Sequence, residues 1–329
     1  MKFYFAPLEG LTDSIFRQLH HRFFPGVDGY YMPFLSPTLH HSLSARERRE
    51  LPPAERLDAP CVPQILTKSP EDFLWAAGLC RDLGYEEVNL NLGCPSGTVV
   101  AKGKGAGMLE SPAALDAFLE KIFSGTPVKI SVKTRLGLTG AGEFPAILEV
   151  LNRYPLAGLI LHPRVQKAFY KGPVDLEAFG LALEASKCPV CYNGDICTPE
   201  DMAGLRRRFP RLEAMMIGRG FIGCPGLLSP GGTTREGLIA FHGALLEAYC
   251  DAFGNRRNAM FRLKENWQYL LCLFEGAEKL GKRLRKTTDF GEFCAITGEI
   301  LENLPMRPAL CPDWREKWDL QLQVSSDII

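Results

Sequence analysis

Short apolar runs alternate with amphipathic stretches along the first two thirds of the chain. The short runs contain many β-branched and aromatic residues and stop at glycine, proline or a polar residue, which is typical of strands. The stretches between them have the period of a helix, and several begin with a Ser-Pro or Thr-Pro pair, a common helix start. The predicted strands cover residues 2–6, 28–34, 60–66, 88–92, 127–134, 157–161, 189–192 and 213–217.

Eight strands that alternate with helices over about 225 residues predict an α/β fold of the (β/α)8 TIM-barrel type. Polar residues gather at the carboxyl ends of these strands, where such barrels carry their chemistry. The rival fold is a doubly wound sheet, which is expected to show a GxGxxG motif after its first strand. The sequence has no such motif there, so we predict the barrel.

The pattern changes after Pro230-Gly231-Gly232. Residues 234–304 show helical periodicity and no clear strand, so we predict a barrel domain over 1–232 and a small helical C-terminal domain over 233–329. Residues 254–288 contain nine lysines and arginines but only three glutamates. Such a cluster is typical either of a solvated helical face or of an RNA contact.

Composition sets wider bounds on the class of protein. The chain has 329 residues, 46% hydrophobic content, 23% charged content and a formal net charge of zero, so only the local basic cluster favours a nucleic-acid partner. The N-terminal apolar run is broken by Pro7 and is too short for a signal peptide, and no run of 18 apolar residues predicts a membrane span. Eleven cysteines without a secretory signal indicate free thiols in a reducing compartment, so we expect a cytoplasmic protein.

One cysteine lies where a predicted strand ends and a loop begins. Residues 88–92 alternate apolar and polar positions, and Gly93 and Pro95 end this strand on either side of Cys94. Free cysteines are commonly small buried apolar residues, and we assign that role to Cys188 and Cys191 in spite of their CxxC spacing. The setting of Cys94 favours a catalytic thiol instead.

Two further polar residues stand near the carboxyl ends of predicted strands. Lys133 lies in an apolar context, where its ammonium either extends to the rim or neutralises an anion. His162 is the one histidine of the six at a strand end. A lone histidine is commonly structural, and the rim position favours a functional role.

The turns after the seventh and eighth strands are rich in glycine. Many barrels bind a phosphate at this place through backbone N–H groups. Ordinary turns are the alternative, but both turns carry suitable residues, so we predict a phosphate site. Its residues are Asn193, Gly194 and Asp195 in the first turn, and Gly218 and Arg219 in the second.

The stretch Asn91-Leu92-Gly93-Cys94-Pro95, with glycines downstream, resembles the signature of the tRNA-dihydrouridine synthases. The resemblance spans about residues 1–225 and extends loosely into the helical tail. Leu8 replaces a more usual methionine, and Pro163 and Val165 stand where many members have glycine and threonine. The resemblance also rests on residues 6–13, 64, 132–135, 162–164, 193–195 and 218–220.

The resemblance implies an FMN site. Pro7, Leu8, Glu9 and Gln64 would approach the isoalloxazine ring, Lys133 and His162 would contact ring or ribityl oxygens, and the two glycine turns would hold the phosphate. A fixed lysine also stabilises the negative charge of a reduced flavin.

The resemblance also implies the chemistry. Hydride from flavin N5 would add to C6 of a uracil, and Cys94 would give a proton to C5, since a thiol is mostly protonated at neutral pH. Asn91 would hold the base edge and Arg164 would contact RNA. NADPH or NADH would reduce the flavin, tRNA would be the partner, and a monomer without an obligate protein partner is expected.

Other functions fit parts of the pattern. A small-molecule FMN oxidoreductase of the same barrel class would share the flavin site, but it needs no basic tail. A non-catalytic RNA-binding module would share the tail, but it needs none of Cys94, Lys133 and His162. Ribosomal RNA remains open as the substrate in place of tRNA.

Overall fold

A computed structural model describes residues 1–38, 40–311, 314 and 318. Its strands form one parallel sheet in the order β3-β2-β1-β9-β8-β7-β6-β5-β4. The strands are β1 (Lys2–Phe5), β2 (Gly29–Tyr31), β3 (Cys61–Val62), β4 (Gln64–Ile65), β5 (Glu87–Leu92), β6 (Lys129–Arg135), β7 (Gly158–His162), β8 (Val190–Asn193) and β9 (Ala214–Ile217).

One interrupted strand closes this sheet into a barrel. β3 and β4 stand at the two ends of the sheet order, and only Pro63 separates them in sequence. Proline has no backbone N–H to donate, but its carbonyl accepts from the Asn89 N–H at 2.8 Å. β3 pairs with β2 and β4 pairs with β5, so β3 and β4 together form the predicted third strand. The (β/α)8 barrel is confirmed.

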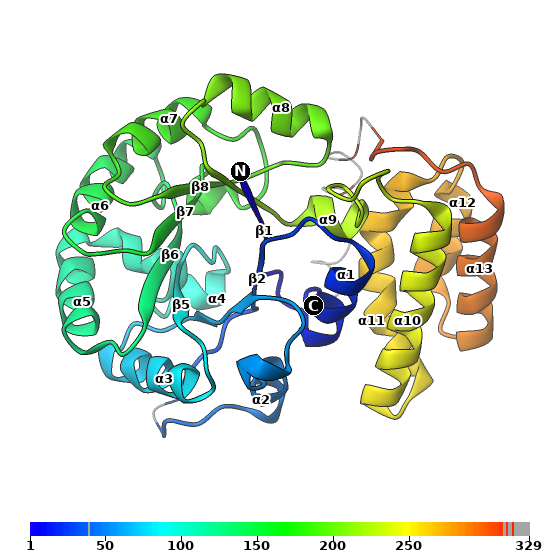
Figure 1. Ribbon diagram of the computed structural model, residues 1–329, viewed down its shortest axis with the longest axis horizontal. Coiled ribbons are helices and arrows are strands. Elements are labelled where there is room, and N and C mark those ends of the chain that lie inside the picture. Colours follow the sequence, from blue (N-terminus) through cyan, green and yellow to red (C-terminus); the bar gives the residue numbers. More distant parts are fainter. Residues whose placement is uncertain (39, 312–313, 315–317, 319–329) are drawn as a thin grey trace. The chain divides into compact units, whose positions relative to one another are not determined.

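Helices α3, α5, α6 and α7 lie outside the strands (Figure 1). The side chains of Ser69, Ser111 and Asp175 cap α3, α5 and α7, which satisfies backbone N–H groups that a helix start leaves unpaired. The helices up to α9 are α1 (Ser14–Phe23), α2 (Ala45–Glu50), α3 (Pro70–Asp82), α4 (Gly97–Val100), α5 (Pro112–Gly125), α6 (Phe144–Leu151), α7 (Leu176–Ala185), α8 (Pro199–Arg208) and α9 (Arg219–Gly223).

The tail is helical, as predicted from its periodicity. Its helices are α10 (Arg235–Phe253), α11 (Arg256–Leu270), α12 (Glu278–Lys286) and α13 (Phe290–Asn303). Short 3-10 helices occur as η1 (Ala54–Arg56), η2 (Gly105–Glu110), η3 (Ala141–Glu143), η4 (Gln166–Ala168) and η5 (Leu271–Leu273).

Two kinds of side chain line the inside of the barrel. An apolar cluster consists of Ala6, Tyr31, Ile160, Cys191 and Met216, one from each of five strands or strand ends. A polar group on β4, β5 and β6 is equally buried and includes Gln64, Asn89 and Ser131. Alternate residues of a strand point to the same face of a sheet, and in these strands that face is the barrel interior. The interior therefore has an apolar wall on one side and a polar wall on β4, β5 and β6.

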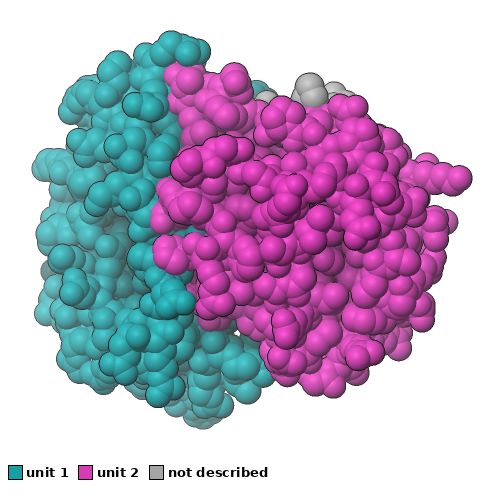
Figure 2. Space-filling view, turned by 45° about the vertical axis from the view of Figure 1, so that its right-hand side comes forward, with its two compact units in different colours: residues 1–9, 28–194, 205–216 teal, residues 10–27, 195–204, 217–329 magenta. Residues whose placement is uncertain are grey.

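The chain divides into two compact units, coloured separately in Figure 2. Unit 1 comprises residues 1–9, 28–194 and 205–216, and unit 2 comprises 10–27, 195–204 and 217–329. Unit 2 therefore takes in α1 and α9 as well as the tail. A single domain boundary at residue 233 stays a prediction, although α10 begins close to it, at Arg235.

An aromatic cluster joins α1 to α10 within unit 2. The Phe241 ring centroid lies 5.6 Å from that of Phe16 and 5.2 Å from that of Phe24. The buried His20 ring packs beside Phe221 at 5.6 Å, and burial lowers the pKa of His20 to about 3. The core around α1 is therefore completed by a side chain of α10.

Replacing Phe241 by alanine tests this dependence. We expect the free energy of unfolding to fall by about 3–5 kcal/mol, the usual cost of removing a buried phenylalanine ring. Phe261 is 39% exposed whereas Phe241 is 1% exposed, so Phe261→Ala is the matched control and should change little. Denaturant unfolding of both variants measures the difference, and equal values would show that the aromatic cluster does not stabilise unit 2.

Candidate active site

The cysteine turn follows β5 and is held by a side chain of that strand. The Oδ1 atom of Asn91 accepts hydrogen bonds from the backbone N–H groups of Gly93 at 3.0 Å and Cys94 at 2.9 Å. Gly105, with φ of +58°, passes so close that a Cβ there would lie 3.0 Å from the Cys94 Cβ. The Asn91 oxygen therefore fixes the turn, and the predicted contact between Asn91 and the substrate base stays a prediction.

A buried arginine supports the same turn from β6. Arg135 donates from Nε to the Gly93 carbonyl at 3.0 Å and from a terminal nitrogen to the Phe169 carbonyl at 2.6 Å. Gln166 adds a hydrogen bond to the Pro95 carbonyl at 2.8 Å. Sequence reasoning gave neither residue a role in the site, although Arg135 belongs to the stretch 132–135 and stands two positions after Lys133, so on the same face of the strand.

The Cys94 thiol is half-buried. Burial raises its pKa, while a backbone hydrogen bond from Ser96 and the charges of Arg135 and Lys133 act in the opposite direction. The net shift is upward, so the thiol carries its proton at neutral pH. The nearby cations would stabilise the thiolate once that proton has left.

Lys133 lies opposite Asn91 in the register of β5 and β6. Burial lowers its pKa to about 8, and the charge of Arg135 acts in the same direction. Within the described part of the chain its ammonium makes no hydrogen bond or ion pair. An ammonium in this position is stabilised by an acceptor or an anion that enters the barrel mouth.

His162 and Arg164 form a buried pair after β7. A terminal nitrogen of Arg164 lies 3.0 Å from His162 Nε2, and Arg164 Nε donates to the Gly172 carbonyl at 3.2 Å. The sequence predicts that Arg164 contacts RNA, but the residue is only 4% exposed. Its guanidinium serves interior acceptors in this structure, and the contact with RNA stays a prediction.

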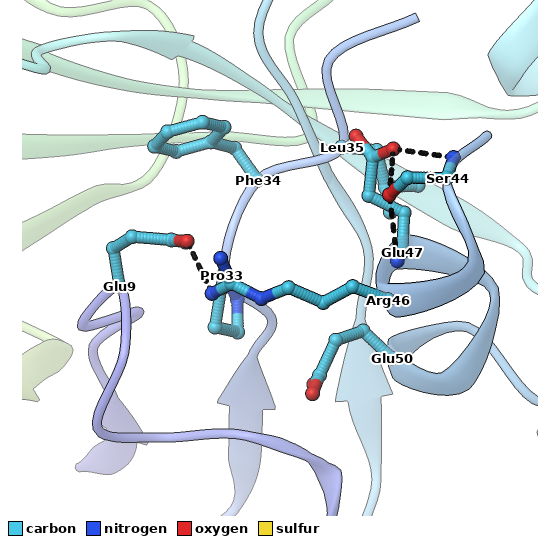
Figure 3. Close-up of a pocket in the computed structure, with 8 residues that line it drawn as sticks. All are labelled: Glu9, Pro33, Phe34, Leu35, Ser44, Arg46, Glu47 and Glu50. Carbon is cyan, nitrogen blue, oxygen red and sulfur yellow. Dashed lines mark hydrogen bonds and ion pairs between the residues drawn. The ribbon is translucent and has the colours of Figure 1, made fainter.

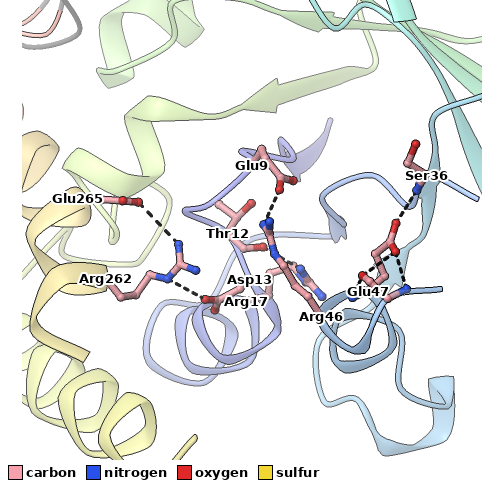
Figure 4. A network of polar contacts seen from close by, with 10 residues as sticks. Glu9, Thr12, Asp13, Arg17, Ser36, Arg46, Glu47, Arg262 and Glu265 are labelled. Atoms are coloured by element: carbon pink, nitrogen blue, oxygen red, sulfur yellow. Dashed lines mark hydrogen bonds and ion pairs between the residues drawn. The ribbon is translucent and has the colours of Figure 1, made fainter. Parts of the chain in front are cut away.

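The first βα turn, with Pro7, Leu8 and Glu9, precedes α1. The Glu9 carboxylate forms an ion pair with Arg46, and both residues line a cavity of about 260 Å³ (Figure 3). Glu47 lines the same cavity and accepts from the Ser36 N–H at 2.7 Å (Figure 4). The predicted approach of Pro7, Leu8 and Glu9 to a flavin ring stays a prediction.

The two glycine turns differ in what their side chains do. In unit 1, Asn193 Nδ2 donates to the Met216 carbonyl at 2.9 Å, and Gly194 has no room for a Cβ beside Val174. In unit 2, Arg219 forms an ion pair of 3.0 Å with Asp195 and follows Gly218 at the start of α9. A phosphate at the second turn would therefore share Arg219 with Asp195.

The amino-acid sequence matches the family model described as "Dihydrouridine synthase (Dus)" over residues 4–272. The chain belongs to the dihydrouridine synthase family.

Similar proteins carry names from this family. The chain is 30% identical to the Synechocystis sp. protein named "Probable tRNA-dihydrouridine synthase 1" over 68% of this chain, and it spans 62% of that relative's length. It is 27% identical to "tRNA-dihydrouridine synthase B" of Vibrio parahaemolyticus over 80% of this chain and 86% of that protein. The histamine dehydrogenase structure from Rhizobium sp. 4-9 has a similar fold, with a TM-score of 0.51 and 13% identity over 69% of this chain and 45% of the other.

Unit 2 of this dihydrouridine synthase family member has a basic face on α11 and α12. Some of its cations are committed within the unit: Arg262 pairs with Asp13 at 3.5 Å (Figure 4), and Lys264 donates to the Arg285 carbonyl at 2.8 Å. Around them lie exposed cations, and Arg257 and Lys264 each lie over the exposed ring of Phe261. We define the α11–α12 basic face as the exposed residues Arg256, Arg257, Lys282, Arg285 and Lys286.

The described residues show neither a metal-binding cluster nor a membrane span. Among them no three His, Cys, Asp or Glu side chains are grouped to hold a metal ion. The helices within the same residues are too short or too polar to cross a bilayer. All eleven cysteines are free thiols, as the sequence predicts.

Proposed function

We propose that this protein reduces specific uridines of tRNA to 5,6-dihydrouridine, with FMN as the resident cofactor and NADPH or NADH as the reductant. Family membership supports the reaction. The observation that carries the proposal is a protonated Cys94 thiol on a turn that Asn91 and Arg135 hold at the carboxyl end of a barrel strand. The Lys133 ammonium lies on the neighbouring strand, without a partner in the described chain.

The residues in the barrel mouth fit a flavin. The Lys133 ammonium lacks an acceptor within the described chain, and a flavin offers carbonyl oxygens and, when reduced, negative charge. Gln64 and Asn91 each use one amide N–H inside the barrel wall and keep a second N–H for a ligand oxygen. When bound, FMN supplies the hydride that adds to C6 of the uracil.

Cys94 supplies the other hydrogen. Its thiol holds a proton at neutral pH and gives it to C5 of the uracil, which leaves a thiolate. The positive charges of Lys133 and Arg135 stabilise that thiolate, and solvent returns a proton before the next turnover. A base inside a helical stack cannot reach this turn, so the uridine has to leave its stack or lie in an unpaired region.

The α11–α12 basic face suits a phosphate backbone. Lysine and arginine side chains bind phosphates without reading sequence, and the Arg257 guanidinium is held over the exposed Phe261 ring. We therefore propose that unit 2 binds the RNA. The choice of tRNA over ribosomal RNA, a monomeric state and a cytoplasmic location remain part of the proposal.

Site-resolved mapping of dihydrouridine in tRNA from strains with and without the gene tests the function. We expect one or a few positions to lose dihydrouridine in the deletion strain and to regain it with the wild-type gene. The purified protein should be yellow and should release FMN when it is denatured. A colourless protein that takes up no added FMN, or an unchanged dihydrouridine map for both tRNA and ribosomal RNA, would contradict the proposal.

Charge reversal tests the basic face. Arg285 and Lys286 are exposed at the end of α12, so the double variant Arg285→Glu/Lys286→Glu should bind tRNA more weakly. The slope of log affinity against log salt should fall by about one for each phosphate that the variant no longer neutralises. Lys121→Glu, an exposed lysine of α5, is the control. An unchanged salt slope in the double variant would exclude these side chains from RNA binding.

A further inference from the structure

Two aromatic side chains are exposed on the loop that follows β7. Phe169 is 44% exposed and Tyr170 is 38% exposed, and the exposed lysines Lys167 and Lys171 lie on either side of this pair. We define the β7 loop as residues 167–171. Surfaces that bind unpaired nucleic acid combine aromatic rings, on which bases stack, with cations that bind the phosphates. The β7 loop therefore carries both parts of such a surface.

The two rings of the β7 loop differ in what they contact. The Tyr170 ring centroid lies 6.0 Å from that of His162 and 5.3 Å from the Cζ atom of Arg135. Among the residues that the structure describes, no comparable ring or cation contact involves the Phe169 ring. Tyr170 is thus engaged at the barrel mouth, and the Phe169 ring is open to a ligand.

The backbone of Phe169 is strained. Its φ is +50° and its ψ is −104°, a conformation that residues with a side chain rarely adopt. Two hydrogen bonds hold this backbone: the Phe169 N–H donates to the Gln166 carbonyl at 3.0 Å, and the Phe169 carbonyl accepts from Arg135 at 2.6 Å. Strain of this kind is found at ligand sites, where the fold holds a residue in one orientation.

The strained residue lies beside the cysteine turn. Arg135 donates to the Gly93 carbonyl as well as to the Phe169 carbonyl. One guanidinium joins these two oxygens, so they lie within about 8 Å of each other, the span of two hydrogen bonds and the group between them. Gln166 donates to the Pro95 carbonyl at 2.8 Å and forms a second link between the loop and the turn. An RNA strand that reaches the turn therefore passes close to Phe169.

We propose that Phe169 stacks on an unpaired nucleobase next to the uridine that reaches Cys94, and that Lys167 and Lys171 bind the phosphates on either side of that base. A base that leaves its stack exposes the face of its neighbour, and an aromatic ring replaces the lost contact. A phenyl ring carries no hydrogen-bonding group, so any of the four bases can occupy this position. This inference rests on the proposed function, and it adds an RNA contact within unit 1.

Photochemical cross-linking shows which ring touches a base. An oligouridine of about ten nucleotides that carries 5-iodouridine is irradiated with the wild-type protein, because iodouracil cross-links to an aromatic ring that stacks on it. Trypsin then releases residues 168–171 as one peptide, which contains both rings of the loop. We expect mass-spectrometric fragmentation to place the cross-linked base on Phe169. A cross-link on Tyr170 alone, or none in this peptide, would overturn the proposal.

Substitutions measure the contribution of the ring to binding. Phe169→Ala and Phe169→Leu should each weaken the affinity for tRNA about 5- to 100-fold, the scale of one lost base stack, and Phe169→Trp should stay within about threefold of wild type. Leu181→Ala is the matched control, because Leu181 is a 73% exposed apolar side chain of α7 in the same unit. Fluorescence anisotropy with labelled tRNA measures all four affinities.

Phe169→Gly separates binding from stability. Glycine adopts a positive φ without steric cost, so the unfolding temperature of this variant should be unchanged or higher, while its tRNA affinity should fall as in Phe169→Ala. A lower unfolding temperature with unchanged affinity would overturn the proposal, because the ring would then only stabilise the loop.

The outcome also keeps this inference apart from the proposed function. If the wild-type protein reduces no RNA but cross-links through Phe169, the function fails and the stacking role stands. If the protein makes dihydrouridine and Phe169→Ala binds tRNA as tightly as wild type, the function stands and this inference is wrong.

Discussion

Replacing Cys94 by alanine slows the oxidation of the pre-reduced enzyme by tRNA by about 10²- to 10⁴-fold, the usual contribution of a positioned general acid. The variant should still bind FMN, because other strands provide the proposed flavin contacts. Its reduction by NADPH or NADH should be unchanged, since that half-reaction needs no proton from the thiol. Stopped-flow absorbance in single-turnover experiments separates the two half-reactions.

The other thiols of the barrel provide the controls. Cys191 belongs to the apolar cluster, and Cys188 lies beside Ser186 ahead of β8, so Cys188→Ala and Cys191→Ala should reduce tRNA at near wild-type rates. Near wild-type rates for Cys94→Ala would remove this thiol from the mechanism. A loss of FMN from Cys94→Ala would instead assign the cysteine to cofactor binding.

Replacing Lys133 by methionine weakens FMN binding by about 10- to 100-fold, the scale of a lost charge-assisted hydrogen bond. Lys129 stands on the same strand but is exposed at its other end, so Lys129→Met is the matched control. Fluorescence titration of the apo-proteins with FMN measures both affinities. Equal affinities in the two variants would show that Lys133 does not contact the flavin.

The lowered pKa of Lys133 adds a test by pH. Its folded pKa of about 8 lies below the usual 10.5 of lysine, so between these two values the unfolded chain binds more protons than the folded chain. The free energy of unfolding of the apo-protein therefore gains a contribution that rises with pH from about 8 to 10.5. This contribution should be absent in Lys133→Met and should shrink when FMN gives the ammonium a partner.

Local signals predicted most of the barrel. The alternation of apolar and polar residues, together with the glycines and prolines that end each run, located all eight barrel strands. Pro63 lies inside the predicted third strand. Its division into β3 and β4 follows from pairing with two different neighbours, β2 and β5, which a local pattern does not contain. For the same reason the sequence does not show that Phe16 of α1 packs against Phe241, more than 200 residues away.

The site was predicted only in part, again because a local pattern does not show distant partners. The signature around Cys94 is local and identified the turn itself. The partners of that turn are not local: Arg135 reaches the Gly93 carbonyl from 42 positions away, and Gln166 reaches Pro95 from 71 positions away. The partners of Arg164 are a further case, because its guanidinium donates to the Gly172 carbonyl, eight positions away, and the sequence gives no sign of this contact.

The place of β1 in the sheet has a consequence for how this protein is made. β1 lies between β2 and β9 in the strand order, and the Lys2 N–H bonds to the Glu213 carbonyl. A ribosome adds about 5–20 residues per second, so the first strand waits on the order of 10 to 40 s for β9 to be synthesised. During that time the apolar wall that includes Ala6 and Met216 is incomplete, and the nascent chain depends on protection from aggregation until its last barrel strand emerges.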